Sequence, residues 1–323
     1  MKWASAVVCV CLLIGLYIFV NRLASKHLAS GAYFGISMVK GAKLPEYLHE
    51  SDGSVSESDI KYFDKNQEDR NMLLKKGAKY IAQAEEILRF DAFDAENKAV
   101  QGGYADKDSY VIAFFKSDDP ASRIRLVRIG LNGEILKASE PLDLDHANNV
   151  AYIPKKNKFL VSHCQSAEGD RYAWYSLVDA DSFEVTETGE LEKPFFSMGY
   201  CPERDRYASG EWGGEWVDVW EEKDGKITLS KHFSEDRPGS LSQGVWAGED
   251  YIWFIRSSTP ASGAEILLYD WETGELCFRI PMEGMNKVEP ENITVRGDEI
   301  TVIGNKEVWG TGGIVYKVEL IEG

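Results

Sequence analysis

Polar side chains that can hydrogen-bond a ligand or exchange a proton recur at nearly constant spacing along the chain. Gln101, Asn148, Ser197, Gln243 and Glu291 are separated by 47, 49, 46 and 48 residues. Amides offer both donors and acceptors to a neutral polar ligand, and a glutamate is the member of this set that can act as a general acid or base. We therefore expect Glu291 to carry proton transfer if the protein is an enzyme.

The segments around these residues form an internal repeat. Each unit starts with a short polar stretch, passes through an acidic turn into an apolar strand, and ends in a later hairpin turn such as LNGE, KDGK or ETGE. Asn-Gly, Asp-Gly and Thr-Gly pairs supply the positive φ angles that tight hairpins need. A period of 40 to 50 residues in an all-β sequence is typical of propeller blades. The sequence predicts an all-β, five-bladed β-propeller.

The two ends of the repeat region predict how the ring closes. The fifth unit stops after the strand GIVYKVELI without an outermost strand, and residues 86–93 read as a strand left over before the first unit. Pairing of this strand with the last unit would leave no exposed sheet edge. We expect a membrane anchor over residues 1–30, a spacer with a short helix (69–84) over 31–85, and the propeller over 86–323.

The loops that enter the innermost strands and those that join the second and third strands emerge on the same face of a propeller. We expect a ligand site there, since polar groups converge around the tunnel with tryptophans beside them. Alternatively, the amides cap strand ends and hold tunnel waters, and Trp212 packs between blades. The predicted ligand-binding residues are Gln101, His146, Asn148, Ser197, Trp212, Gln243, Arg256, Glu291, Asn292 and Trp309.

Charge and cysteine usage exclude some classes of function. A net charge of −17 and a pI near 4.8 disfavour nucleic acid as a partner, because such binding needs basic patches. No C-x-x-C pair or metal-ligand spacing occurs in the body of the chain, so we predict no metal site and no cofactor. Cys164 and Cys201 lie in neighbouring units and could pair, although buried free thiols are the expected state of the body cysteines.

The N-terminal segment predicts a single membrane span. Residues 3–20 contain no charged side chain over 18 positions, close to the length of about 20 residues that crosses a bilayer. One basic residue, Lys2, precedes the span, and several follow it. By the positive-inside rule this distribution of charge keeps the body of the chain inside. The two-residue leader favours the opposite orientation, and we expect a cell-membrane protein with an extracytoplasmic propeller.

The hairpin at 269–275 has the pattern hydrophobic-Asp-x-x-Thr-Gly-Glu and, with the Gln-Gly unit starts, resembles bacterial five-bladed propeller proteins with an N-terminal membrane anchor. The start Ser242-Gln243-Gly244 also resembles the Thr-Gln-Gly blade starts of glutaminyl cyclotransferases, although the Glu-Leu-Glu element of that family is not visible. This second resemblance implies Glu291 as the acid–base residue, with Gln243 and Asn148 orienting substrate. Five-bladed arabinan hydrolases place acids at several blade starts, which this chain does not.

These observations support two main hypotheses about function. The first is a membrane-tethered propeller that binds a small polar molecule, a saccharide or a cell-envelope protein at its tunnel mouth. The second is an enzyme, either glutaminyl cyclotransferase-like or a lyase or hydrolase, that uses Glu291. A structural spacer is a third possibility if side chains plug the tunnel mouth.

Overall fold

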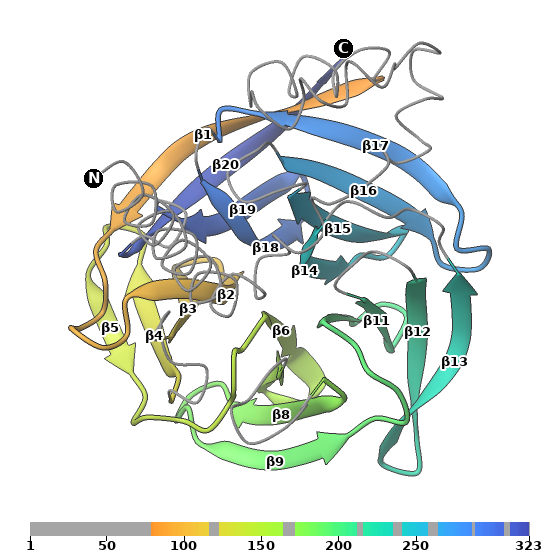
Figure 1. Ribbon diagram of the computed structural model, residues 1–323, viewed down its shortest axis with the longest axis horizontal. Helices are drawn as coiled ribbons and strands as arrows, with labels where there is room; N and C mark the ends of the chain where they lie inside the picture. Colours follow the sequence, from red (N-terminus) through yellow and green to blue (C-terminus); the bar gives the residue numbers. More distant parts are fainter. Residues whose placement is uncertain are drawn as a thin grey trace, which may run out of the picture.

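The computed structural model describes residues 79–115, 123–163, 172–211, 216–234, 241–257, 264–285, 288–306 and 311–322. These residues form an all-β, propeller-like fold in which the sheets stand around a common centre (Figure 1). Besides strands they contain one short 3-10 turn, η3 (Pro154–Lys156). No helix of the described ranges is long and apolar enough to span a membrane, and the expected anchor at residues 3–20 lies outside them.

Three sheets each consist of four sequential antiparallel strands. The first contains β2 (Ala99–Ala105), β3 (Ser109–Phe115), β4 (Arg125–Gly130) and β5 (Ile135–Ala138). The second contains β6 (Asn149–Ile153), β7 (Lys158–Ser162), β8 (Trp174–Asp179) and β9 (Val185–Glu190). The third contains β10 (Ser197–Cys201), β11 (Arg206–Gly210), β12 (Trp216–Lys223) and β13 (Lys226–Ser234). In the second sheet, burial falls outward from β6, which is almost wholly buried, to β9, which is almost wholly exposed.

The remaining strands form one eight-stranded sheet in the order β14-β15-β16-β17-β1-β20-β19-β18. Its first half contains β14 (Leu241–Ala247), β15 (Tyr251–Ser257), β16 (Ala264–Asp270) and β17 (Leu276–Glu283). Its second half contains β18 (Glu289–Arg296), β19 (Glu299–Asn305), β20 (Gly313–Glu322) and β1 (Tyr80–Phe90). The two halves meet where β1 lies parallel to β17.

The strand β1 pairs antiparallel with β20 from Tyr80 to Phe90, so the N-terminal strand completes the sheet of the last strands (Figure 1). Its bounds differ from the expected strand at 86–93, and residues 80–84 are extended where a helix was predicted. Both edges of β1 are used there, because Ala82 is opposite Met282 of β17 as well as Leu320 of β20. This double pairing satisfies the backbone groups of an extended chain and outweighs local helix propensity.

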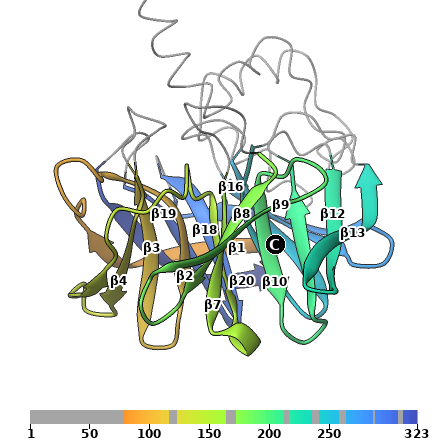
Figure 2. The ribbon, with the colours of Figure 1, turned by 90° about the horizontal axis from the view of Figure 1, so that it is seen from below.

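The innermost strands β2, β6, β10, β14 and β18 each contact the next, and β18 contacts β2, which closes the ring. The first residues of these strands meet one another, since Gln101 of β2 hydrogen-bonds Glu291 of β18. Their last residues also meet, because Tyr104 of β2 packs against Tyr152 of β6 and Trp246 of β14. The innermost strands therefore run in one direction. Figure 2 shows the sheets from the side.

The hairpin at 269–275 shows how the repeated turn is built. The Asp270 carboxylate accepts hydrogen bonds from the backbone N–H groups of Glu272 at 2.8 Å and Thr273 at 2.7 Å, and Gly274 has φ 70°. These backbone hydrogen bonds lower the pKa of Asp270. The Asp-x-x-Thr-Gly pattern is therefore an Asx-type turn followed by a left-handed glycine.

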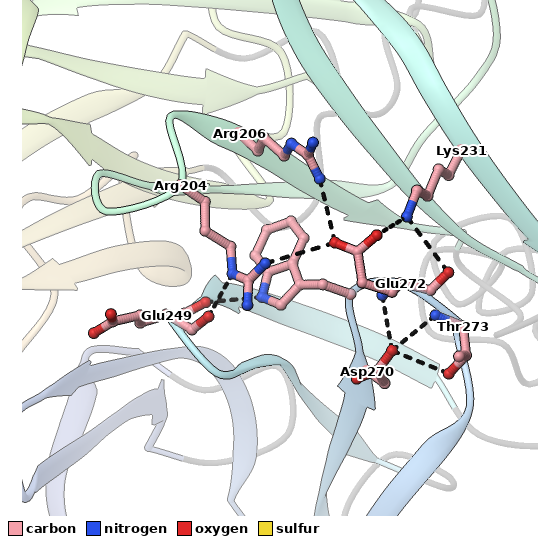
Figure 3. A network of polar contacts seen from close by, with 9 residues as sticks. Arg204, Arg206, Lys231, Glu249, Asp270, Glu272 and Thr273 are labelled. Atoms are coloured by element: carbon pink, nitrogen blue, oxygen red, sulfur yellow. Dashed lines mark hydrogen bonds and ion pairs between the residues drawn. The ribbon is translucent and has the colours of Figure 1, made fainter.

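This turn also links two sheets through a polar network on the outside of the fold (Figure 3). The Glu272 carboxylate lies 3.7 Å from Arg204 in the β10–β11 turn, 3.5 Å from Arg206 of β11, and against Lys231 of β13. The Arg204 guanidinium also stacks over Trp271 at 5.4 Å. The contact with Lys231 is the main cause that lowers the pKa of Glu272.

The described cysteines are free thiols in different environments. Cys201 is buried, and burial raises its pKa to about 11. Cys277 is exposed, so the expectation of a buried thiol was wrong there, because this residue lies on the outward side of β17. Cys164, the suggested disulfide partner of Cys201, lies outside the described residues.

Candidate functional site

Three innermost strands carry a β-bulge at the same point. The register with the second strand shifts between Val100 and Gly102 in β2, between Ser242 and Gly244 in β14, and between Pro290 and Asn292 in β18. The extra residues are Gln101, Gln243 and Glu291. A bulged residue leaves the ladder and its side chain is aimed differently from its neighbours, which is why bulges are frequent beside active sites.

The glycine that follows each bulged glutamine is explained by the neighbouring inner strand. A Cβ added to Gly102 would clash with the carbonyl oxygen of Ala147, and one added to Gly244 would lie 2.8 Å from the Cα of Asn292. In each Gln-Gly pair, the bulge redirects the glutamine side chain, and the glycine allows the neighbouring backbone to come close.

The Glu291 carboxyl group is held by amides from two strands. Gln101 Nε2 donates to Glu291 Oε2 at 3.1 Å, and Asn305 Nδ2 donates to Glu291 Oε1. Asn305 in turn accepts from the backbone N–H of Val100 at 2.8 Å, which connects β19 to β2. Glu291 is therefore fully buried with defined partners for both of its oxygens.

A second carboxyl group, Glu289, lies two residues earlier on the same strand. Gln243 Nε2 donates to Glu289 Oε1 at 2.9 Å and to Ser257 Oγ at 3.1 Å. Glu289 is also fully buried. Glu289 was not predicted, because it lies outside the repeat register, in which Glu291 is the one acidic position of five. Its spacing of two residues from Glu291 on a strand was the available signal.

Burial raises the pKa values of both carboxyl groups. Burial raises the pKa of Glu289 to about 8. Burial, and then the charge of Glu289, raise the pKa of Glu291 well above its usual range, and the hydrogen bond from Asn305 opposes this only in part. Two interacting carboxyls in a desolvated site titrate together, so the titration belongs to the pair rather than to either residue.

Two oxygens of this cluster are buried without a hydrogen-bond partner in the described part of the chain. They are Glu289 Oε2 and Gln101 Oε1, on side chains that are 0% and 3% exposed. Buried polar atoms in folded proteins nearly always have partners, so unpartnered ones require an explanation. A protonated Glu289 has a hydrogen to donate, and the Gln101 oxygen has two lone pairs to offer.

Asn149 forms the centre of a second hydrogen-bond network. Its Nδ2 donates to the carbonyl oxygens of Met198 at 2.8 Å and Val245 at 3.2 Å, and its Oδ1 accepts from Asn292 Nδ2 at 2.6 Å. One amide on β6 thus ties together β10, β14 and β18. Asn292, predicted to bind ligand, has its amide occupied by this contact.

His146 and Asn148 form a third buried group. His146 Nδ1 lies 2.8 Å from Asn148 Oδ1, and Asn148 Nδ2 donates to the Phe196 carbonyl at 3.3 Å. The His146 ring packs edge-on against Phe115 with centroids 4.5 Å apart. Burial lowers the pKa of His146 to about 4, so the imidazole is neutral at physiological pH.

The remaining predicted site residues are Arg256, Ser197, Trp212 and Trp309. Arg256 is fully buried, with its guanidinium over Phe254 at 5.4 Å and Tyr269 at 5.8 Å. Ser197 is buried at the start of β10. Trp212 and Trp309 lie outside the described residues. Within the described ranges no group of three or more His, Cys, Asp or Glu side chains is placed to hold a metal.

Comparison with known proteins identifies a fold class. No family model matches the chain, and no curated protein matches it in sequence. Among solved structures, the glutaminyl cyclase of Myxococcus xanthus is similar with a TM-score of 0.51 and 12% identity, over 75% of this chain and 98% of that one. The hydrazine synthase of Kuenenia stuttgartiensis matches with a TM-score of 0.41 and 11% identity, over 71% of this chain and 64% of that one. The chain thus shares a propeller-like fold with the glutaminyl cyclase, and at this identity the likeness concerns the fold alone.

Proposed function

We propose that the protein is a five-bladed propeller that binds a small, uncharged polar ligand at the end of its centre where Gln101, Gln243 and Glu291 meet. In this proposal the eight-stranded sheet counts as two blades joined by β1. The observation that carries the site is the set of three bulges at equivalent points, with Glu289 Oε2 and Gln101 Oε1 buried and unpartnered beside them.

The chemistry of these groups favours a ligand that both donates and accepts hydrogen bonds. A protonated Glu289 supplies a donor and Gln101 Oε1 supplies an acceptor, as a primary amide or a hydroxyl-bearing ligand requires. A charged ligand is disfavoured, because a desolvated site penalises an ion without a counter-charge. Small primary amides and saccharides are therefore the first ligands to test.

Binding is tested by the change in melting temperature of the whole chain with primary amides and neutral sugars. The matched variants are Gln101→Ala and Glu289→Gln, with the exposed Glu249→Gln as control. We expect a ligand-dependent rise that Gln101→Ala abolishes and the control retains. A rise of equal size in Gln101→Ala would place the ligand elsewhere.

A second candidate is an acyl-transfer enzyme that cyclises N-terminal glutaminyl residues. Two observations favour it: the buried carboxyls Glu289 and Glu291, whose pKa values burial raises, and the propeller-like fold in common with a glutaminyl cyclase. In such a reaction the α-amine attacks the side-chain amide carbon, and the acid–base group moves a proton from that amine to the departing ammonia. Ammonia release from a glutaminyl peptide that is lost in Glu291→Gln, with the melting temperature unchanged, would establish it. No release by the wild-type chain would reject it.

We also propose that residues 3–20 tether the propeller to the cell membrane with its body outside the cytoplasm, where a saccharide or a cell-envelope protein would be its partner. The uncharged segment, close in length to a membrane span, supports the tether. Proteolysis of the body in intact cells is the expected result, and protection from added protease would reverse the proposed orientation.

A further inference from the structure

A cavity of about 260 Å³ lies at the opposite end of the innermost strands from Glu291. The strands β2 and β6 end beside it, and its walls come from the first and second sheets. The residues that line it and bear on its chemistry are Tyr104, Asp106, Arg128, Tyr152, Asn157 and Asp181. Tyr104 is three residues after Gln101, or about 10 Å along an extended strand, so this cavity is separate from the carboxyl cluster.

Aromatic rings form one part of the cavity wall. Tyr104 packs against Tyr152 and Phe159 with centroid distances of 5.7 Å in both cases, and against Trp246 at 6.4 Å with an interplanar angle of 24°. These contacts hold the Tyr104 ring in place from several sides. Aromatic side chains held in this way present apolar surface together with a polar hydroxyl.

Hydrogen-bonding groups of both kinds face the aromatic part. Tyr152 donates to Asn157 Oδ1 at 2.9 Å, and Asn157 Nδ2 donates to Asp181 Oδ2 at 2.8 Å. This chain of contacts orients Asp181 and uses one of its carboxylate oxygens. No described residue hydrogen-bonds the other oxygen, Oδ1, or the hydroxyl of Tyr104.

The cavity wall carries two carboxylates, Asp106 and Asp181, and one guanidinium, Arg128. Arg128 is fixed by Asp106 Oδ2 at 3.4 Å, Ser109 Oγ at 3.1 Å and the Ala180 carbonyl at 3.1 Å. The excess of one negative charge disfavours an anion, and the fixed Arg128 guanidinium opposes a cation beside it. A neutral ligand with several hydroxyl groups meets donors and acceptors without such a penalty.

Size and chemistry together define the ligand class. The volume lies just below the range of about 300 to 1,000 Å³ typical of sites for drug-sized ligands, so one six-membered ring fits better than an extended molecule. We propose that this cavity is a second binding site, independent of the proposed function, for a neutral hexopyranose. The ring C–H groups would contact Tyr104 and Tyr152, and the hydroxyls would bond Asp181 Oδ1 and the Tyr104 hydroxyl.

The test is calorimetric titration of the full chain with glucose, galactose and N-acetylglucosamine, with glucosamine and glucuronate as charged controls. We expect at least one neutral sugar to bind with a millimolar Kd. The variant Asp181→Asn should weaken it roughly tenfold, since hydrogen bonds to charged groups are the stronger kind. Tyr104→Phe keeps the ring but removes the hydroxyl, and should weaken it about threefold to tenfold.

Glu291→Gln serves as the matched control, because it alters the carboxyl cluster and leaves this cavity intact. Equal sugar affinity in Glu291→Gln and wild type supports an independent site. The proposal is overturned if no neutral sugar saturates the protein, if only a charged sugar binds, or if the affinity is unchanged in both Asp181→Asn and Tyr104→Phe. Loss of affinity in Glu291→Gln alone would assign the sugar to the carboxyl cluster instead.

Discussion

Replacement of Glu289 by glutamine probes the proton that the buried carboxyl pair holds. Glutamine at this position keeps an oxygen that accepts from Gln243 Nε2, and its amide N–H₂ takes the place of the carboxylic O–H. The variant therefore imitates the protonated wild type at every pH. Its stability should differ from that of wild type only where Glu289 would ionise.

The sign and size follow from the pKa of Glu289, which is raised by burial from 4.5 to about 8. The folded state binds the proton more tightly than the unfolded state, so this contribution is fully present below pH 4.5 and is lost as pH rises through about 8. A pKa difference of one between the folded and unfolded states corresponds to about 1.4 kcal/mol. The free energy of unfolding therefore falls by on the order of 3–5 kcal/mol for this fully buried group. Glu291 adds a loss of the same sign, which persists in the variant.

The measurement is urea unfolding of wild type, Glu289→Gln and the exposed control Glu249→Gln from pH 5 to pH 9. We expect wild type and Glu289→Gln to be equally stable near pH 5 and the variant to be more stable above pH 8, while the control follows wild type. Parallel curves for wild type and Glu289→Gln across this range would refute the argument that Glu289 is protonated in the folded protein. Lower stability of the variant at high pH would show that the carboxylate is the favoured form.

Other substitutions test separate parts of the structure. The pKa of His146 is lowered by burial from 6.5 to about 4, so stability should fall as pH drops from 6.5 towards 4, and His146→Gln should remove this dependence in acid unfolding curves. Gly102→Ala should destabilise by about 2 kcal/mol or more in urea unfolding, because its Cβ clashes with a backbone oxygen, whereas Gly225→Asn, with φ 75° and no neighbour within 4 Å, should change little. Asn149→Leu should cost about 3 kcal/mol or more by the same assay, since two buried carbonyls and one amide lose their partner. Glu272→Gln should lower the melting temperature in dilute buffer and have a smaller effect in high salt, where exposed ion pairs are screened; an effect independent of salt would contradict this account.

The repeat was predictable because it depends on local chemistry. Turn residues such as Gly225 and Gly274 adopt the positive φ angles that their sequence pattern predicts. The meeting of Gln101 with Glu291 could be expected from the position of each residue at the start of a repeat unit. The partners Asn305 and Ser257 were not predicted, because they come from the second strand of their sheets, where no pattern marks a polar residue as facing inward.

The pairing of residues 80–84 of β1 with β17 could not be predicted from the sequence either. Residues 80–84 have the composition of a short helix, and only the presence of two strand edges at once makes the extended form better. The exposed Cys277 likewise depends on which side of β17 faces solvent.

The sequence by itself determined the all-β character, the repeat length and the polar residues that begin each unit, because these follow from turn chemistry and hydrophobic alternation along the chain. The tertiary structure alone decided that Gln101, Gln243 and Glu291 are bulged, that Glu289 joins them, and that burial raises the pKa values of both carboxyls. The physical reason is that desolvation and bulge geometry depend on what surrounds a residue from distant parts of the chain, and a linear pattern does not contain that information.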